Sequence, residues 1–419
     1  MKAILPFGFV ILTVIFFWQC EKDPVPEIVV SDDMFLQALI AEGVDKDQNG
    51  KISPGEAESI KVLDISDKNI SDLSGIESFF NLDTLRCGWN QLTSFELQGN
   101  TNLVYLSCEH NPLVALDISG NAKLEVLNCS YDGLETLDLS ANPLIKQLYC
   151  EGDSLASLEL SELTHLKMFN CANGKFTQLD VSHNTVLEDL NCSGNRINTL
   201  DLTSNGNLIT LNCSRNKLTS INVSQCLALD MIICNDNQLS TLDIASNIAL
   251  TRLICEHNLL TNLDVTHNTN LFGFGCENNQ LTDLDLSKNT NLSTFYCQQN
   301  QLTSLDLSHN PALGWFDCSQ NQLTTLDLSN NADLYYMVCS QNQLTGMDIS
   351  ACTALRYLYC GGNQLTTLNI VSNSNLENLD IQNMTSLLKV CVGILPIPPG
   401  HPWIEQTGSP NVVYSMDCL

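Results

Sequence analysis

Apolar residues recur along this chain at a fixed interval of 21 residues. A cysteine marks the interval in 14 successive units, from Cys87 to Cys360. In the unit that begins at Cys297, apolar residues occupy positions 1, 6, 9, 11, 17 and 20, counted from the cysteine as position 1. A fixed interval of roughly 20 to 50 residues is typical of a solenoid, whose repeats stack on one another. The pattern therefore predicts a solenoid rather than a globular core.

Two pairs of alternating apolar positions predict two short strands in each unit. Positions 9 and 11 face inward around position 10, and position 20 alternates with position 1 of the next unit. Stacking then produces two short parallel β-sheets, so the fold class is mostly β. Asparagine recurs at positions 4 and 14, where its side chain can hydrogen-bond to the backbone of a turn.

The column of cysteines predicts buried thiols. Stacked residues keep their Cβ atoms about 4.8 Å apart, whereas a disulfide needs about 3.8 Å. Zinc needs converging ligands at short spacing, which one thiol in each coil does not supply. Cys226 and Cys352 stand at position 14 and are also expected to be free and buried. Beyond the repeats, Cys391 and Cys418 flank a proline-rich segment; they are expected to form a disulfide, or else two further buried thiols.

The pattern Leu-x-x-Leu-x-Cys-x-x-Asn-x-Leu-x-x-Leu-Asp-Leu resembles the leucine-rich repeat family in its short, 21-residue bacterial variety. The resemblance covers residues 62–381. It implies a right-handed coil, and strands on both sides of that coil suggest a straighter rod than a helix-backed horseshoe. The chain is also similar to leucine-rich repeat proteins of the internalin type, which implies adhesion without naming a partner.

The net charge of the chain limits its partners, and its N-terminal residues indicate where the protein is located. The chain holds 47 acidic and 18 basic residues, a net charge of −29, so nucleic acid is excluded as a partner. Residues 1–20, with Lys2 before the apolar run Ala3–Trp18 and with Cys20 at the end, resemble a bacterial lipoprotein signal. The resemblance implies a lipid on Cys20, a tether over 21–31, and a position on the outside of the outer membrane. A signal anchor or a secreted protein is the alternative.

Residues 32–61 are expected to cap the first coil, beginning with a helix over Asp32–Glu42. The segment that follows resembles the 12-residue calcium loop of an EF-hand, with oxygen ligands at alternate positions and Gly50 at the sharp turn. The resemblance implies a structural calcium ion, and the alternative is an acidic turn without metal. Its ligands would be Asp45, Asp47, Asn49, the carbonyl of Lys51, Ser53 and Glu56. At the other end, residues 382–419 are expected to form a C-terminal cap.

Two outward-facing columns are candidate surfaces. Position 10 is Asp in ten of the 14 units, where Ser and Thr neighbours can donate hydrogen bonds or cations can bind. On the other sheet, aromatic residues gather at positions 19 and 21 toward the C-terminal half. They suit a protein or sugar ligand, although strand propensity alone also favours them. These candidate ligand-binding residues are Trp315, Tyr336, Tyr357, Tyr296 and Tyr359.

No catalytic constellation stands out, because the seven histidines are scattered and no Ser/His/Asp set or phosphate loop is present. We therefore expect a non-catalytic, monomeric cell-surface protein that binds another protein. A glycan-binding accessory protein that uses the aromatic residues and a passive structural stalk are the alternatives.

Overall fold

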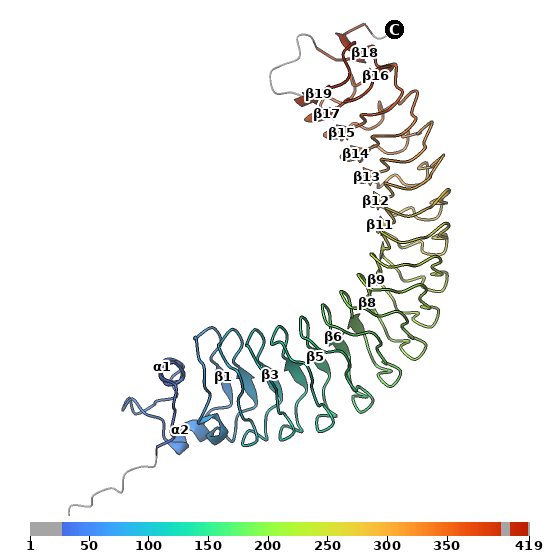
Figure 1. Cartoon of the computed structure of the whole chain (residues 1–419). Coiled ribbons are helices and arrows are strands. Elements are labelled where there is room, and N and C mark those ends of the chain that lie inside the picture. The colour runs from blue at the N-terminus through green and yellow to red at the C-terminus, as the bar shows by residue number, and fades with distance from the viewer. Residues whose placement is uncertain (1–26, 395–402, 418–419) are drawn as a thin grey trace, which may run out of the picture.

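A computed structural model describes residues 27–394 and 403–417 as a curved solenoid (Figure 1). Short parallel strands follow the inner, concave side of the arc, and each strand pairs with the next strand of its sheet along the chain. In the described part of the chain this concave sheet contains 17 strands. They are β1 (Val62–Asp64), β2 (Thr84–Arg86), β3 (Tyr105–Ser107), β4 (Val126–Asn128), β5 (Gln147–Tyr149), β6 (Met168–Asn170), β7 (Asp189–Asn191), β8 (Thr210–Asn212), β9 (Met231–Ile233), β10 (Arg252–Ile254), β11 (Gly273–Gly275), β12 (Thr294–Tyr296), β13 (Trp315–Asp317), β14 (Tyr336–Val338), β15 (Tyr357–Tyr359), β17 (Asn378–Asp380) and β19 (Trp403–Glu405).

The 21-residue interval is also the pairing register, so equivalent residues lie side by side. Phe295 pairs with Phe316, for example, and both side chains point into the core, where their ring centroids are 5.8 Å apart. The predicted mostly β solenoid of parallel strands is confirmed. Residues at positions 20 and 1 are buried in every cysteine-marked coil, and those at positions 19 and 21 face the concave surface.

The second sheet is much shorter than the sequence suggests. It consists of β16 (Thr367–Asn369), β18 (Lys389–Cys391) and β20 (Val413–Ser415), and elsewhere the described chain shows two isolated bridges on this side. In those three strands the residues that pair in register with Asn369, at position 10, are Cys391 and Ser415, and all three are uncharged. Most other coils place an aspartate there, and one of the two isolated bridges joins two such aspartates, Asp327 and Asp348, so charge at this position does not by itself prevent pairing.

The stack is curved rather than straight, as the pronounced arc in Figure 1 shows, and its curvature relative to a helix-backed horseshoe stays a prediction. Continuous strand pairing fixes the spacing of the concave side at about 4.8 Å per coil. The outer side lacks a continuous ladder and is free to spread, so the stack bends toward its strands.

Asparagines at two corners of each coil form the predicted hydrogen-bond ladders. At position 4, Asn321 Nδ2 donates to the carbonyls of Cys297 and Cys318 at 2.9 and 3.1 Å, and its Oδ1 accepts from Leu302 N at 3.0 Å. At position 14, Asn310 Nδ2 donates to two carbonyls of the preceding coil. The ladders satisfy backbone groups that water cannot reach.

The cysteine prediction is confirmed for the repeats. All 14 cysteines of the column are free and buried, as are Cys226 and Cys352. Those two thiols lie 3.6 and 3.8 Å from carbonyls of the preceding coil and replace an asparagine at position 14. The substitution is tolerated because the Oδ1 atoms of most position 14 asparagines accept no hydrogen bond. Only a donor is needed in that slot.

At the N-terminal end lie α1 (Asp33–Ala41), α2 (Pro54–Glu58) and the 3-10 turn η1 (Ile76–Ser78). The predicted helix is α1 together with its flanking residues: Asp32 is the N-cap, and its side chain accepts from the amides of Met34 and Phe35. At the other end, β18, β19 and β20 lie in the segment assigned to the C-terminal cap, and they extend both sheets.

Candidate functional site

Six aromatic residues form one surface cluster on the concave sheet, here called the aromatic patch. It lies on β12 to β15, with Tyr335 just before β14. Trp315 stacks on Tyr336 with ring centroids 5.2 Å apart, and Tyr336 lies 6.1 Å from Tyr357 and 5.6 Å from Tyr359. The structure thus brings together Trp315, Tyr336, Tyr357 and Tyr359 of the predicted set, and Tyr296 lies on the same face at the end of β12. The members are Tyr296, Trp315, Tyr335, Tyr336, Tyr357 and Tyr359.

Polar contacts fix the C-terminal border of the aromatic patch. The hydroxyl of Tyr357 donates to Glu377 Oε2 at 2.8 Å, and Arg356 Nη1 contacts Glu377 Oε1 at 2.6 Å. The guanidinium of Arg356 also lies 5.6 Å from the ring centre of Tyr335. The hydrogen bond to Glu377 raises the pKa of Tyr357 to about 12, so its phenol stays protonated. These contacts pre-order the rings, which lowers the entropy lost when a ligand binds.

Sequence reasoning missed the acidic residues beside the aromatic patch. Glu256 and Glu277 share position 2 in successive coils, and Asp317 stands at position 21 between Tyr296 and Tyr359. Burial raises the pKa of Glu277, and the neighbouring Glu256 carboxyl raises it further. Burial also raises the pKa of Asp317, against hydrogen bonds from Ser319. The columns at positions 2 and 21 would have placed these residues on the aromatic face.

A second aromatic column was also missed. Trp89, His110 and Tyr131 share position 3 in successive coils and stack with ring centroids 3.7 and 4.6 Å apart. All three adopt positive φ in the turn after the strand. The ring of Tyr131 lies over Gly152, where a Cβ would come within 2.4 Å of it. The shared repeat position was the available sequence signal.

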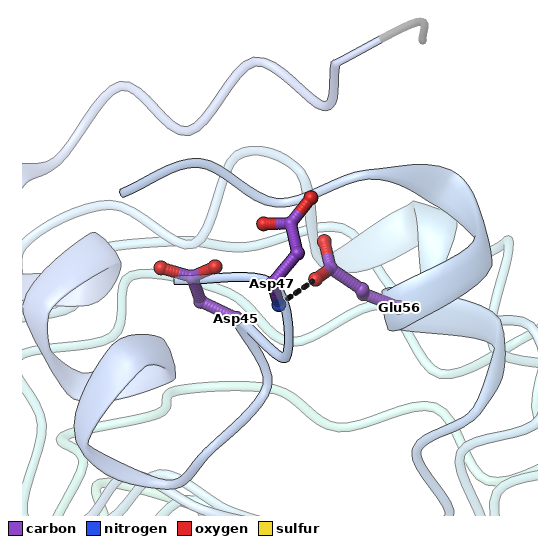
Figure 2. A group of neighbouring side chains, drawn as sticks. All are labelled: Asp45, Asp47 and Glu56. Carbon is purple, nitrogen blue, oxygen red and sulfur yellow. Dashed lines mark hydrogen bonds between the residues drawn. The ribbon is translucent and has the colours of Figure 1, made fainter. Parts of the chain in front are cut away.

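The calcium-like loop joins α1 to α2 and brings three of its predicted ligands together. One carboxylate oxygen from each of Asp45, Asp47 and Glu56 lies within 4.8 Å of the others (Figure 2). Ser53 caps α2 and forms a capping box with Glu56. Hydrogen bonds, chiefly from the amide of Ser53, lower the pKa of Glu56 to about 2, so that carboxyl is ionised.

The other predicted ligands play supporting parts in the loop. Asn49 Oδ1 accepts from the amide of Lys51 at 2.8 Å, and Ser53 Oγ donates to Glu56 Oε2 at 2.8 Å. The amides of Asn49 and Gly50 donate to Asp45. The donor set is entirely hard oxygen, and the backbone wraps around the carboxylates, which fits calcium. Among the described residues, this is the one group of three acidic, histidine or cysteine side chains close enough to hold a metal ion.

The aspartates at position 10 bond to their own coil. Asp306 Oδ1, for example, accepts from the amide of Ser308 at 2.9 Å, and hydrogen bonds from Ser308 lower the pKa of Asp306. This is the expected pairing with Ser or Thr, and it explains why carboxylates are kept in the column.

Two predicted sites fall partly or wholly outside the described residues. Cys20, the predicted lipidation site, lies outside them. Cys391 is disulfide-bonded, whereas its predicted partner Cys418 is again outside the described part, so this pairing stays a prediction. Within the described ranges, no helix is both long enough and apolar enough to span a bilayer.

Comparison with known proteins places the fold. No protein-family model and no curated protein matches the chain. Among solved structures, the chain is similar to the functional domain of InlJ from Listeria monocytogenes, which includes a cysteine ladder. The identity is 36%, the TM-score is 0.72, and the match covers 86% of this chain and 74% of that one.

More distant structures share the fold. A leucine-rich repeat protein of Leptospira interrogans is 24% identical with a TM-score of 0.72, and the match covers 82% of this chain and 92% of that one. A leucine-rich repeat protein of Bacteroides eggerthii is 15% identical with a TM-score of 0.66, over 82% of this chain and 70% of that one. The similarity to InlJ, at that identity and coverage, shows that the chain belongs to the bacterial leucine-rich repeat proteins of the internalin type.

Proposed function

We propose that this protein is a non-catalytic binding protein of the bacterial cell surface, and that the aromatic patch binds another protein. The observation that carries the proposal is the patch itself. Large rings gather on the concave sheet, and Trp315, which stacks on Tyr336, is 45% exposed. Exposed Trp and Tyr side chains held by neighbouring rings are typical of binding hot spots, because they bury much area at a small loss of conformational entropy.

The proposal is tested by capture of partners from cell-surface extracts with the purified protein. Replacement of Trp315 by Ala should weaken capture by about tenfold or more, the loss expected for an aromatic hot-spot residue. Trp89→Ala is the matched control, because Trp89 is 57% exposed but lies outside the aromatic patch. Equal capture by both variants would contradict the proposal. Binding to a glycan array that Trp315→Ala abolishes would support the glycan-binding alternative instead.

We also propose that a lipid on Cys20 anchors the protein at the outer face of the outer membrane. The lipoprotein-like signal over residues 1–20 supports this location. The Cys20→Ser protein should then appear in the aqueous phase after detergent phase partitioning, whereas the parent protein follows the detergent. Partitioning of both proteins into the aqueous phase would point to secretion.

A calcium ion in the loop between α1 and α2 would be structural in this proposal. Asp45, Asp47 and Glu56 would hold it, and it would neutralise their mutual repulsion. The loop lies far from the aromatic patch along the arc (Figure 1), so the proposed ion has no direct part in partner binding.

A further inference from the structure

The concave face is interrupted beside the aromatic patch. Gly273 and Gly275 occupy both outward positions of β11, so this strand presents no side chains to the concave surface. A Cβ on residue 275 would lie 3.1 Å from Glu277 Oε2, and a Cβ on residue 273 would lie 3.7 Å from the guanidinium of Arg252. The carboxyl of Glu277 therefore folds back beside Gly275, and the side chain of Arg252 borders Gly273 on the other side of β11.

One oxygen of the Glu277 carboxyl lacks a hydrogen-bond partner, whereas the Glu256 side chain hydrogen-bonds to the same carboxyl. Glu277 is only 8% exposed, and its Oε2 atom is buried and accepts no hydrogen bond in the described structure. Burying a carboxyl oxygen without a hydrogen-bond partner destabilises the folded protein. A ligand that donates a hydrogen bond to Glu277 Oε2 would offset this loss of stability.

Two further carboxyls border the same place. Glu256 precedes Glu277 by one coil at the same repeat position, and Asp317 lies beside Tyr296 in the register of β12 and β13. Burial is the largest cause of the raised pKa of the Tyr296 phenol, and the charges of Glu277 and Asp317 raise it further. Both carboxyls therefore lie near that ring. No ion pair to these three carboxyls occurs among residues 27–394 and 403–417.

The three carboxyls do not form a compact group of metal ligands. They do not form a group whose oxygens lie within 4.8 Å of one another, unlike the loop near α2, among the residues that the structure describes. A guanidinium is flat and broad, donates several hydrogen bonds at once, and stacks on aromatic rings. Separated carboxyls next to Tyr and Trp rings match that shape and charge.

We propose that the notch formed by Gly273, Gly275 and Glu277 receives an arginine side chain of the protein partner, with Glu277 and Asp317 as its acceptors. The guanidinium stacks on the neighbouring aromatic patch, and Tyr296 stands at the border between the two. This inference rests on the proposed function, because it names the chemistry that the partner presents to the concave face.

The test uses a fluorescein-labelled hexapeptide that carries two arginines, beside the same peptide with citrulline in their place. Citrulline keeps the shape and removes the charge. Binding to the purified protein is measured by fluorescence anisotropy at 0.15 M salt, which weakens contacts among exposed charges. The arginine peptide should bind about tenfold or more tightly than the citrulline peptide.

Variants locate the binding. Glu277→Gln and Asp317→Asn should each weaken binding of the arginine peptide by about tenfold. Asp306→Asn is the matched control: it lies in the same coil, changes the net charge equally, and bonds to the residue two positions on, as Asp317 does. Its binding should be unchanged. The melting temperature of each variant checks that it is folded.

Two results would overturn the inference. Equal binding of the citrulline peptide would show that charge is not recognised. Equal losses in Asp317→Asn and Asp306→Asn would show that the acidic protein attracts the peptide without a site. If Trp315→Ala loses the natural partner while Glu277→Gln and Asp317→Asn retain it, the proposed function stands and the arginine notch does not.

Discussion

At the scale of single residues, repeat position 4 shows how closely the fold depends on the side-chain amide of one asparagine in each coil. Asparagine there donates to two carbonyls and accepts from an amide. Asp132 and Asp153 occupy this slot in two successive coils and have no amide hydrogens to donate. Asp132 Oδ1 accepts from Asn111 N at 2.7 Å, whereas Asp153 Oδ2 is buried without a partner. Burial raises the pKa of Asp132 to about 8 and that of Asp153 to about 6.

The raised pKa of Asp132 predicts that the protein loses stability as the pH rises. Its ordinary pKa is 3.8, so the contribution to stability is complete below about pH 4 and is lost as the pH approaches 8. Asp132→Asn restores the amide and removes the ionisable group. It should raise the free energy of unfolding by on the order of 3 kcal/mol at pH 8, and by much less at pH 4.5.

Urea unfolding at the two pH values measures this effect. Asp306→Asn serves as the control, because hydrogen bonds lower the pKa of Asp306 and its contribution does not change between pH 4.5 and 8. A gain in stability from Asp132→Asn that is the same at both pH values would show that Asp132 is not protonated in the folded protein.

At the scale of elements, the repeat columns predict most of the concave sheet but not its details. Residues 21 apart in the sequence lie side by side in the structure. This rule alone places Trp315 beside Tyr336, and it places Asn310 in the ladder of asparagines at position 14. It is not enough to place Glu277 over Gly275, because that contact depends on how one side chain folds back across its own strand. The second sheet was overestimated for a similar reason. Apolar alternation shows which residues face the core, but it does not report whether neighbouring backbones lie close enough to pair.

The cap gives a prediction about calcium. Three carboxylates held within 4.8 Å repel one another, and a bound cation would offset that repulsion. Calcium should therefore raise the melting temperature of the protein, and a chelator should lower it. Asp47→Asn removes one exposed ligand without touching the capping box of α2, and it should weaken calcium binding roughly tenfold.

Calorimetric titration and thermal melting of both proteins check this. Asp33→Asn, which changes the charge of α1 outside the loop, should bind calcium like the parent. An unchanged melting temperature of the parent protein in calcium and in chelator would exclude the metal site and leave an acidic turn.

At the scale of the whole molecule, each coil contacts mainly its neighbours, so the chain behaves as a stack of interchangeable units. The arc then has a local cause in every coil: paired strands inside and unpaired segments outside. The cap lies at one end of the stack, and the aromatic patch and the notch at β11 lie in adjoining coils far from it. Removing a coil that belongs to none of them should leave all three in place.

Deletion of Cys192–Asn212 tests this stacking. It removes 21 residues and joins Asn191 to Cys213, so the alternation and both asparagine columns continue across the junction. The protein should fold with a somewhat lower melting temperature, shorten by about 4.8 Å along the concave side, and keep its Trp315-dependent partner capture. Deletion of Cys192–Leu211 removes only 20 residues and leaves one extra residue between strand and corner. This shift of one residue reverses which side chains face the core at the junction. The melting temperature should therefore fall much further than after the 21-residue deletion. Melting curves and small-angle scattering compare the two, and equal stability of both deletions would mean that register does not hold the coils together.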